Sequence, residues 1–423
     1  MNLKSKVLHF FTNILYTLSE SKHFIFRKVL FSCLVFLIEK TTHCKVYRIV
    51  DADTYAKSHS SPVVCLKTDR VGYAANAVRV GIDEQQILKE IPLPDLNLYT
   101  FSDVHIHRCS DLIVNVKEKT IINDYCAHND DKNKPYNDSV TRCQRGKIAL
   151  LCLPRNVRYL ECGIMINGQY SFNYYHDLYE NLIKIMAVLE YNEKIPSTVP
   201  FIVDEDIINI PSLKRICEIL TKDINRQVIP IRKNESIHVN CLYGLSDINY
   251  IVPAHVDYTK GEIEDFVFEK YYTLKLRNYL LSNKSTKEFP KRFFITRKGS
   301  SHRQINEDEL FAVLEPLGFK MVAPEQLSFE DQMRLFNDAE WIVGCTGAAF
   351  TNLLFCSSKC HVICFVRHGY IPPCFTAPVC FNKATMVNFQ AAPKKTTPKA
   401  HSDFRIDTQN FADFMNSYFG INN

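Results

Sequence analysis

Residues 291–303, KRFFITRKGSSHR, and residues 341–355, WIVGCTGAAFTNLLF, decide the fold of this chain. In each stretch a short run of aromatic and β-branched residues leads into a turn that contains glycine. Such runs predict buried strands, here Arg292–Thr296 and Trp341–Val343. Because glycine has no Cβ, the turns that follow allow a ligand to approach the backbone closely.

Between and after these stretches, helix and strand patterns alternate. Asn306 and Glu309 have the spacing of a capping box, and they predict a helix start. Gly318 can end that helix. The predicted apolar stripe of the helix is Leu310, Phe311, Leu314 and Leu317. The other predicted elements are a strand at 319–322, a helix capped by Ser328 with Asp331 at its third position, a helix at 350–355 and a strand at 361–365. This order predicts a doubly wound α/β unit.

The two glycine-containing turns have the chemistry of a phosphate site. Ligands of doubly wound sheets bind beyond the carboxyl ends of the strands, where Arg297, Arg303, Gly344 and Gly347 are expected. Arginine binds phosphate oxygens bidentately, and the start of the helix at 350–355 favours an anion. Taken singly, each feature is more often an ordinary turn glycine or a solvated arginine. Their joint position favours a diphosphate site that needs no metal.

Several short motifs in this region resemble glycosyltransferase family 61, which includes capsular-polysaccharide, xylan and protein O-GlcNAc-type transferases. They are Thr296-Arg297, Arg303 with Asn306-Glu307, Gly318-Phe319, 324–328 (PEQLS), 341–344 (WIVG) and 347–352 (GAAFTN). The family pattern, close to V-G-x-H-G-A-x-x-T-N, has histidine where this chain has Thr346. A threonine hydroxyl can still donate to a phosphate oxygen. The resemblance implies donor binding by Arg297, Arg303, Glu325, Gly344, Thr346, Gly347, Ala348, Thr351 and Asn352.

The resemblance extends over about residues 95–370 and includes an upstream helix at 171–182. At helical spacing His176 and Glu180 are neighbours, on the side opposite a predicted buried stripe. That stripe is Leu178, Leu182, Ile185, Met186 and Leu189. An inverting glycosyl transfer needs a base for the acceptor hydroxyl. The resemblance implies Glu180 as that base, His176 as its partner, and Asn173 and Asp177 in acceptor binding. The alternative is an ordinary His–Glu pair on a solvated face.

Two acidic triplets, Asp51-Ala52-Asp53 and Asp204-Glu205-Asp206, have the D-x-D form that some transferases use to hold a divalent metal. Among 46 acidic residues such triplets arise readily by chance. We interpret both as surface or helix-start acids. We therefore expect no metal and no cofactor beyond the nucleotide-sugar co-substrate.

The first forty residues combine basic charge with apolar clusters. Six basic residues against Glu20 and Glu39 give this segment a balance of +4, out of +5 for the chain. The apolar run at 29–38 is short for a bilayer span, and the pattern predicts a peripheral anchor on an anionic membrane. The alternatives are an uncleaved signal anchor, which would place the protein in the secretory lumen, and a plain packing helix. The near-neutral remainder argues against nucleic-acid binding.

The chain of 423 residues is long enough for two domains. The predicted parts are a lead (1–40), an acceptor-side lobe (41–284), a polar linker, a nucleotide-sugar-binding lobe (291–369) and a tail (370–423) that packs back on the first lobe. Sixteen cysteines without a C-x-x-C pair indicate a reduced, cytoplasmic chain. We predict an α/β, GT-B-like glycosyltransferase, inverting and metal-independent, which acts on an oligosaccharide or glycan acceptor in surface or capsular polysaccharide synthesis. Two alternatives are a catalytically silent glycan- or nucleotide-binding relative and a metal-dependent GT-A-type enzyme using Asp204 and Asp206.

Overall fold

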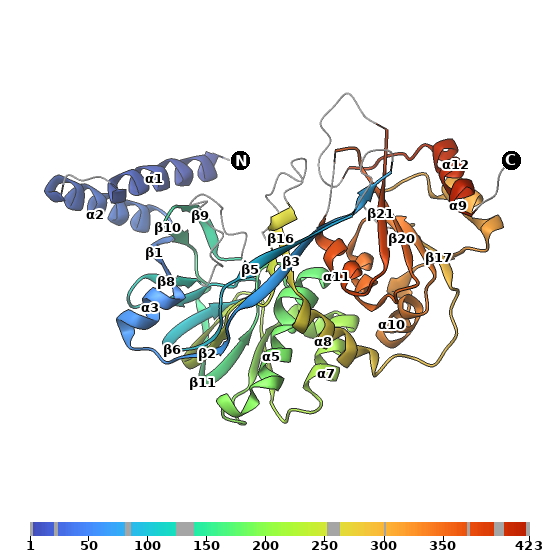
Figure 1. The fold of residues 1–423 in the computed structure, drawn as a ribbon. Helices are drawn as coiled ribbons and strands as arrows, with labels where there is room; N and C mark the ends of the chain where they lie inside the picture. Colours follow the sequence, from blue (N-terminus) through green and yellow to red (C-terminus); the bar gives the residue numbers. More distant parts are fainter. Residues whose placement is uncertain are drawn as a thin grey trace. The chain divides into compact units, whose positions relative to one another are not determined.

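The computed structural model describes residues 3–20, 24–80, 86–123, 139–251, 263–299, 302–369, 373–392 and 402–419. It confirms a mixed α/β protein (Figure 1). The chain forms two compact units. Unit 1 comprises residues 1–70 and 92–255, and unit 2 comprises residues 71–91 and 256–423. The predicted linker at 282–290 therefore lies inside unit 2, and a segment near residue 80 that reads as part of the first lobe belongs to the second.

Unit 1 is built on an 11-stranded mixed sheet with the order β13-β12-β11-β14-β6-β7-β8-β1-β10-β9, in which β2 also pairs with β6. Its strands are β1 (Lys45–Asp51), β2 (Val63–Lys67), β6 (Leu96–His107), β7 (Ile113–Asn115), β8 (Thr120–Asn123), β9 (Thr141–Arg145), β10 (Ile148–Leu151), β11 (Asn156–Ile166), β12 (Phe201–Asp204), β13 (Val228–Ile231) and β14 (Glu235–Leu245). A two-residue strand, β15 (Tyr250–Ile251), follows them.

Four neighbouring strands of this sheet, β13-β12-β11-β14, are parallel. In chain order they run 3-2-1-4, so β11 and β14 lie side by side, and the chain after β11 leads to β12 while the chain after β14 leaves this sheet. The helical segments of unit 1 after β11 are α4 (Tyr174–His176), the π-helix η1 (Asp177–Leu182), α5 (Lys184–Glu190), η2 (Asn192–Lys194), α6 (Glu205–Asn209) and α7 (Pro211–Thr221). Ligands of such sheets bind at this kind of switch point.

The N-terminal lead forms two helices, α1 (Leu3–Glu20) and α2 (Phe24–Thr41), which appear as a hairpin in Figure 1. Leu15 and Ile38 are buried in a cluster with Val46, Ile148 and Leu150, so the hairpin packs on β1 and β10. Among the described residues, no helix is long and apolar enough to cross a membrane. On the same unit, α3 (Ala52–His59) packs against strand β6.

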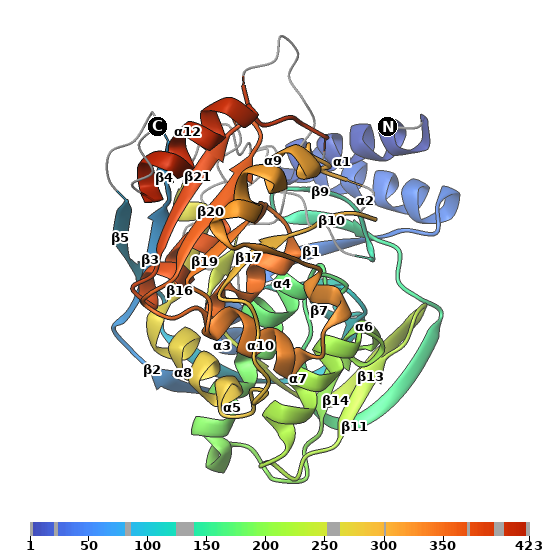
Figure 2. The same ribbon diagram turned by 90° about the vertical axis from the view of Figure 1, so that its right-hand side faces the viewer.

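Unit 2 contains a six-stranded sheet with the order β18-β17-β19-β20-β21-β4 (Figure 2). All its pairings are parallel. Its strands are β4 (Val78–Arg79), β17 (Arg292–Ile295), β18 (Lys320–Val322), β19 (Trp341–Cys345), β20 (His361–Val366) and β21 (Thr385–Gln390). The doubly wound order predicted from the sequence is confirmed. Separately, β3 (Arg70–Asn76) pairs antiparallel with β16 (Phe266–Glu269), and β5 (Ile87–Leu93) lies beside β3.

The helical segments of unit 2 are η3 (Ile263–Asp265), α8 (Lys270–Leu281), α9 (Glu307–Leu314), η4 (Glu315–Leu317), η5 (Pro324–Gln326), α10 (Phe329–Asn337), η6 (Ala348–Phe355), η7 (Pro373–Phe375), α11 (Thr376–Phe381) and α12 (Thr408–Phe419). The predicted helix ends are confirmed at Gly318, which has φ +83°, and at Ser328, whose hydroxyl accepts from the Asp331 amide. The helix after the glycine turn is a 3-10 helix.

Two predictions in unit 2 are wrong. The C-terminal tail does not pack on the first lobe, because Phe411 and Met415 of α12 lie in one core with Phe294 and Leu310. Asn306 precedes α9 but makes no capping bond with its side chain. Its Oδ1 accepts from the Ile406 amide at 3.0 Å, so this side chain holds the tail instead.

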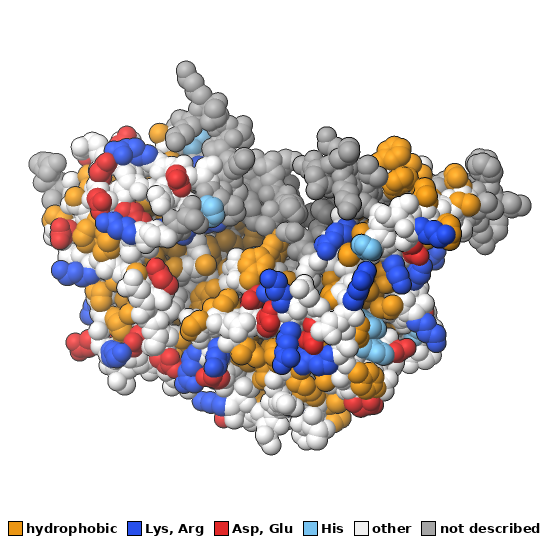
Figure 3. All heavy atoms as spheres, turned by 180° about the vertical axis from the view of Figure 1, so that it is seen from behind, with side chains coloured by type: hydrophobic (Ala, Val, Ile, Leu, Met, Phe, Trp, Pro, Cys, Tyr) orange, Lys and Arg blue, Asp and Glu red, His pale blue; other side chains and the backbone are white. Residues whose placement is uncertain are grey.

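Charged side chains of both signs are interspersed over the face drawn in Figure 3. The Lys and Arg side chains on that face do not merge into one continuous basic surface. A nucleic-acid-binding surface would need clustered basic residues.

Candidate functional site

In unit 2, the candidate donor site lies where β17 and β19 end. These two strands are parallel neighbours, while β18 flanks β17 on its other side. The connections after β17 and β19 therefore diverge, which is the switch point where doubly wound folds bind ligands. Arg297 follows β17 and Thr346 follows β19, so the sheet brings together two segments almost fifty positions apart.

Arg297 lies directly against Gly347. A Cβ built on Gly347 would overlap Nη1 of Arg297, so glycine is needed for this guanidinium position. Gly347 has extended backbone angles, φ 172° and ψ 178°, that any residue could adopt. The requirement for glycine here is therefore space for the arginine.

Arg303 reaches the same turn from a strained backbone. Its φ is +56°, which is uncommon for a residue other than glycine and is found disproportionately at functional sites. Nη1 of Arg303 donates to the Thr346 carbonyl at 3.0 Å. The predicted joint placement of Arg297 and Arg303 at one glycine turn is thus confirmed.

Glu307, a residue to which we assigned no role from the sequence, orders the arginine loop. It is buried, and its Oε1 accepts from the Arg297 amide at 2.6 Å. Its Oε2 accepts from the Thr296 hydroxyl at 2.6 Å. A buried carboxylate with two charge-assisted bonds fixes the direction in which the loop leaves β17.

The other predicted donor-binding residues form two groups, one with exposed side chains and one with buried side chains. Ala348 and Glu325 are exposed at the carboxyl edge of the sheet, where a ligand can reach them. Thr346, Thr351 and Asn352 are buried. The Asn352 side chain donates to Gln332 at 2.8 Å. These three side chains therefore support the turn from inside, and their predicted direct contact with a donor does not match this placement.

In unit 1, a pocket opens at the carboxyl ends of β11 and β14, the second switch point. We call it the His176 pocket. It is lined by Asp111, Asn167, Gly168, Gln169, Tyr170, His176, Glu180, Asn181, Lys184, Asp247, Asn249, Tyr250 and Ile251. Eight of its side chains are carboxylates, carboxamides or a cation, and they come from four separate chain segments. Such convergent polar groups in one concave site are typical of ligand binding.

His176 and Glu180 meet in this pocket, as predicted. Nδ1 of His176 is in hydrogen-bond contact with Oε1 of Glu180. Glu180 lies in η1, a π-helix that begins directly after His176, and this rare conformation occurs frequently at functional sites. Tyr170, whose φ is +57°, stacks on the His176 ring at 4.8 Å between centroids. Leu178, Leu182, Ile185 and Met186 are buried as predicted, while Leu189 is only partly so.

Asp177 and Asn173 have structural roles that the sequence did not indicate. Asp177 is fully buried, and its Oδ1 accepts from Asn181 at 2.8 Å. Burial raises the pKa of Asp177 well above its usual value. A Cβ on Gly168 would overlap Oδ1 of Asn181, so the turn after β11 is fitted to this pair. Asn173 caps α4 by accepting from the Tyr175 amide at 3.0 Å. Asp177 was predicted to bind the acceptor, but its burial does not fit a direct contact with the acceptor.

Four polar residues of the pocket escaped the sequence reasoning. Lys184 pairs with Asp247 at 2.7 Å, and the Gln169 amide donates to both carboxylate oxygens of Asp111 at 3.1 Å. Lys184 is four positions after Glu180, so helical spacing could have indicated it. The presence of Asp111 and Asp247 in the pocket can be inferred only from the strand order, because both residues are far from the helix in sequence.

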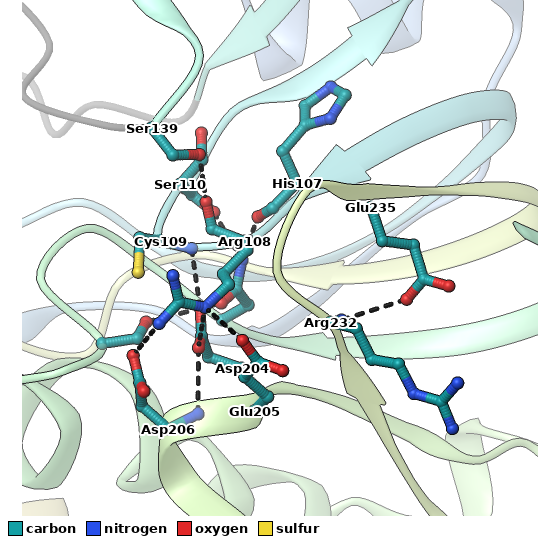
Figure 4. A network of polar contacts seen from close by, with 12 residues as sticks. His107, Arg108, Cys109, Ser110, Ser139, Asp204, Glu205, Asp206, Arg232 and Glu235 are labelled. Atoms are coloured by element: carbon teal, nitrogen blue, oxygen red, sulfur yellow. Dashed lines mark hydrogen bonds and ion pairs between the residues drawn. The ribbon is translucent and has the colours of Figure 1, made fainter. Parts of the chain in front are cut away.

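The acidic triplet at 204–206 surrounds Arg108 (Figure 4). Nε of Arg108 lies 3.2 Å from both Asp204 and Glu205, and its Nη2 pairs with Asp206. Asp204 also caps α6, which confirms the helix-start alternative, and its side chain is fully buried. Cys109, Asp204 and Asp206 are close enough to hold a metal. However, the guanidinium of Arg108 already neutralises these acids.

The first triplet is a helix start as predicted. Asp51 caps α3 by accepting from the Thr54 amide at 2.7 Å. Asp53 accepts from the Tyr99 hydroxyl at 2.8 Å. Both carboxylates thus have local structural partners.

The geometry of both switch points can be compared with known families. The family model described as Glycosyltransferase 61 matches residues 164–363. This region belongs to glycosyltransferase family 61. The family assigned from the motifs is confirmed over this range, which begins in β11, includes His176 and Glu180, and ends in β20. No curated protein matches the chain significantly. The family implies a glycosyltransferase, with a nucleotide-sugar donor and a glycan acceptor.

We predict that Arg108→Ala destabilises unit 1 because it leaves buried Asp204 without its cation. Breaking a buried pair costs about 3–5 kcal/mol in unfolding free energy. Burial already raises the pKa of Asp204, and loss of Arg108 would raise it further. The folded variant would then hold a proton that the unfolded chain releases, so the deficit should be largest at neutral pH and shrink as pH falls.

The measurement is urea denaturation of wild type and variant at pH 7 and pH 5. Arg215→Ala is the control, because Arg215 forms an exposed pair with Glu218. Exposed pairs contribute about 0–1 kcal/mol. A loss in Arg108→Ala no larger than in the control would contradict a structural role for this network.

Proposed function

We propose that the protein is an inverting glycosyltransferase that moves a sugar from a nucleotide-sugar donor to a glycan acceptor without a metal ion. The observation that carries the proposal is the convergence of Arg297 and Arg303 on the Thr346-Gly347 turn at the switch point of unit 2. Unit 2 would hold the donor and unit 1 the acceptor, in a GT-B arrangement of two lobes.

The donor diphosphate would bind at the carboxyl edge of the unit 2 sheet. Arg297 and Arg303 supply two permanent positive charges there, and guanidinium groups bind phosphate bidentately. Exposed Ala348 lies at the start of η6, where its small side chain leaves the backbone accessible. When the bond between the anomeric carbon and the diphosphate breaks, these charges would stabilise the negative charge on the leaving group.

The acceptor hydroxyl would bind in the His176 pocket, with Glu180 as the base. The Glu180 carboxylate takes the proton of the acceptor hydroxyl. At the same time, the hydroxyl oxygen attacks the anomeric carbon on the face opposite the diphosphate. His176, in contact with Glu180 and stacked on Tyr170, would orient the carboxylate. Lys184 and Asp247 would hold other hydroxyls of the acceptor.

The metal-dependent alternative receives less support. Asp204 is fully buried and paired with Arg108, so a divalent ion would have to displace a guanidinium. The arginines of unit 2 offer a separate source of positive charge for a diphosphate. A role in surface or capsular polysaccharide synthesis rests on the family resemblance alone.

We also propose that the α1–α2 hairpin attaches the protein to an anionic membrane surface, on the cytoplasmic side. One side of the hairpin packs on unit 1, while Phe10 and Phe36 remain about 60% exposed, at 61% and 60%. Leu30 and Leu37 are also exposed. Lys40 lies over the Phe36 ring, 4.7 Å from its centroid, so basic and apolar groups occur together. This combination is typical of interfacial helices.

For the donor site, we predict that Arg297→Ala and Arg303→Ala each weaken binding of nucleoside diphosphates. Loss of a charge-assisted bond costs about 1.5–3 kcal/mol, or roughly 10- to 100-fold in Kd. The measurement is calorimetric titration with UDP and GDP, each with and without EDTA. Lys298→Ala is the matched control, since Lys298 belongs to the same loop but pairs with Asp308 at 2.6 Å. Unchanged affinity in both arginine variants would rule out this site, and binding that EDTA abolishes would favour a metal.

For the base, we predict that Glu180→Gln lowers turnover by about 10²–10⁴-fold, because glutamine keeps the shape but accepts no proton. Donor affinity should not change, since the residue belongs to unit 1. His176→Ala should slow turnover less, because an orienting group contributes less than the base. Turnover and donor Kd are measured together, with Glu193→Gln as an exposed control. Wild-type turnover in Glu180→Gln would show that Glu180 is not the base and that the His176–Glu180 pair is an ordinary structural contact.

For the hairpin, we predict that replacing Phe10, Phe36 and Leu37 together by serine releases the protein from vesicles. Each apolar side chain contributes about 1.5–3 kcal/mol when buried, so three should reduce binding by at least about 100-fold. Deletion of residues 1–40 is less informative, because it would uncover the cluster around Leu150. Flotation with phosphatidylserine vesicles is the measurement, and Val63→Ser with Val64→Ser, two exposed positions on β2, is the control. Equal flotation of all three proteins would place the attachment elsewhere.

A further inference from the structure

We propose that unit 1 has a second sugar subsite beside the His176 pocket, and that the acceptor is therefore an oligosaccharide of at least two units. The reacting unit would occupy the His176 pocket and the next unit would occupy the neighbouring one, which we call the Tyr99 pocket. This inference rests on the proposed function, because it assigns the acceptor of the same site.

The two pockets are neighbours in unit 1. Asp111, Asn167, Lys184 and Asp247 line both of them. A ligand that occupied both pockets would have these four side chains at the junction between its two units.

The Tyr99 pocket has the amphipathic lining that a sugar ring requires. Its lining includes the four shared polar side chains and Asn123, which can bond to hydroxyl groups. Its floor is apolar, with Tyr99 and Phe101 stacked at 5.5 Å and with Ile113 and Met165 beside them. The two rings are almost completely buried. Polar groups placed around an apolar floor suit the hydroxyls and the C–H faces of one sugar.

Proton transfer is confined to the other pocket. Of the described residues that line the Tyr99 pocket, only the shared Asp111 and Asp247 carry a carboxylate, and none is a histidine. Asp247 is paired with Lys184, and Asp111 accepts from Gln169. A sugar bound in the Tyr99 pocket thus meets binding groups without a His–Glu pair, as expected for a unit that positions the acceptor and does not react.

Gly244 keeps the Tyr99 pocket open. It lies in β14, and a Cβ added there would stand 3.3 Å from Phe101 and 3.5 Å from Ile113. An alanine is therefore tight but tolerable, whereas the two methyl groups of valine would extend over the floor. This glycine offers a way to fill the subsite without changing any residue of the His176 pocket.

The test compares four pairs of sugars: glucose with cellobiose, galactose with lactose, xylose with xylobiose, and N-acetylglucosamine with N,N′-diacetylchitobiose. Kd values are measured by ligand-observed NMR on the full-length protein. For at least one pair, wild type should bind the disaccharide about tenfold or more tightly than the monosaccharide. Gly244→Val should abolish that preference while leaving monosaccharide affinity unchanged, and Asn123→Ala should reduce it. Asn240→Val, at an exposed position of β14 outside both pockets, is the matched control.

Equal binding of both members of every pair, or no binding of any disaccharide, would overturn the second subsite. So would a preference that survives in both Gly244→Val and Asn123→Ala. Asn123→Ala decides the matter if Gly244→Val fails to fold, which circular dichroism would reveal. The UDP and GDP titrations distinguish this failure from failure of the proposed function, because they test unit 2 independently of the acceptor.

Discussion

The contact between the Arg297 guanidinium and the bare Cα of Gly347 constrains the whole candidate donor site. It requires that β17 and β19 be neighbours, because only then do the loops after them meet. It also requires that Arg297 leave its strand in one direction, which Glu307 enforces through the Arg297 amide and the Thr296 hydroxyl. Arg303 completes the arrangement by bonding to the Thr346 carbonyl. Cationic charge is thereby held in place before any ligand arrives, so little reorganisation would be needed on binding.

A comparable constraint acts in unit 1, where the switch point between β11 and β14 is lined by polar side chains over a buried network. The π-helical turn η1 turns Asp177 inward and leaves His176 and Glu180 at the pocket. Because burial raises the pKa of Asp177, this carboxyl is favoured in its neutral form, which costs far less to bury than a charge. Gly168 and Asn181 fit around it. The stability cost of these buried polar groups and of the strained Tyr170 backbone is concentrated at the pocket, as is common for functional sites.

Local sequence patterns predicted more of unit 2 than of unit 1. The strand runs, Gly318 and Ser328 report on neighbours within a few positions, and each was read correctly. The Arg297–Gly347 contact could be anticipated because parallel strands end at one edge. In contrast, Asp111, Asn167 and Asp247 converge only through the order of an 11-stranded mixed sheet, which no local pattern encodes. The same reason explains why the Arg108 network was missed: nearly a hundred positions separate the arginine from Asp206.

At position 346 this chain has threonine where the family pattern has histidine. The surroundings of Thr346 indicate how far this substitution weakens the proposal of a transferase. The Thr346 side chain is buried, while its backbone carbonyl accepts a hydrogen bond from Arg303. Any residue at this position can supply that carbonyl, so the arrangement of the arginines does not depend on an imidazole. What threonine lacks is a group that could carry a positive charge toward a phosphate. Two arginines that remain charged at every physiological pH lie at the same turn, so the electrostatic requirement for diphosphate binding can be met without the histidine. The substitution therefore bears on the pH dependence of donor binding more than on whether a donor binds.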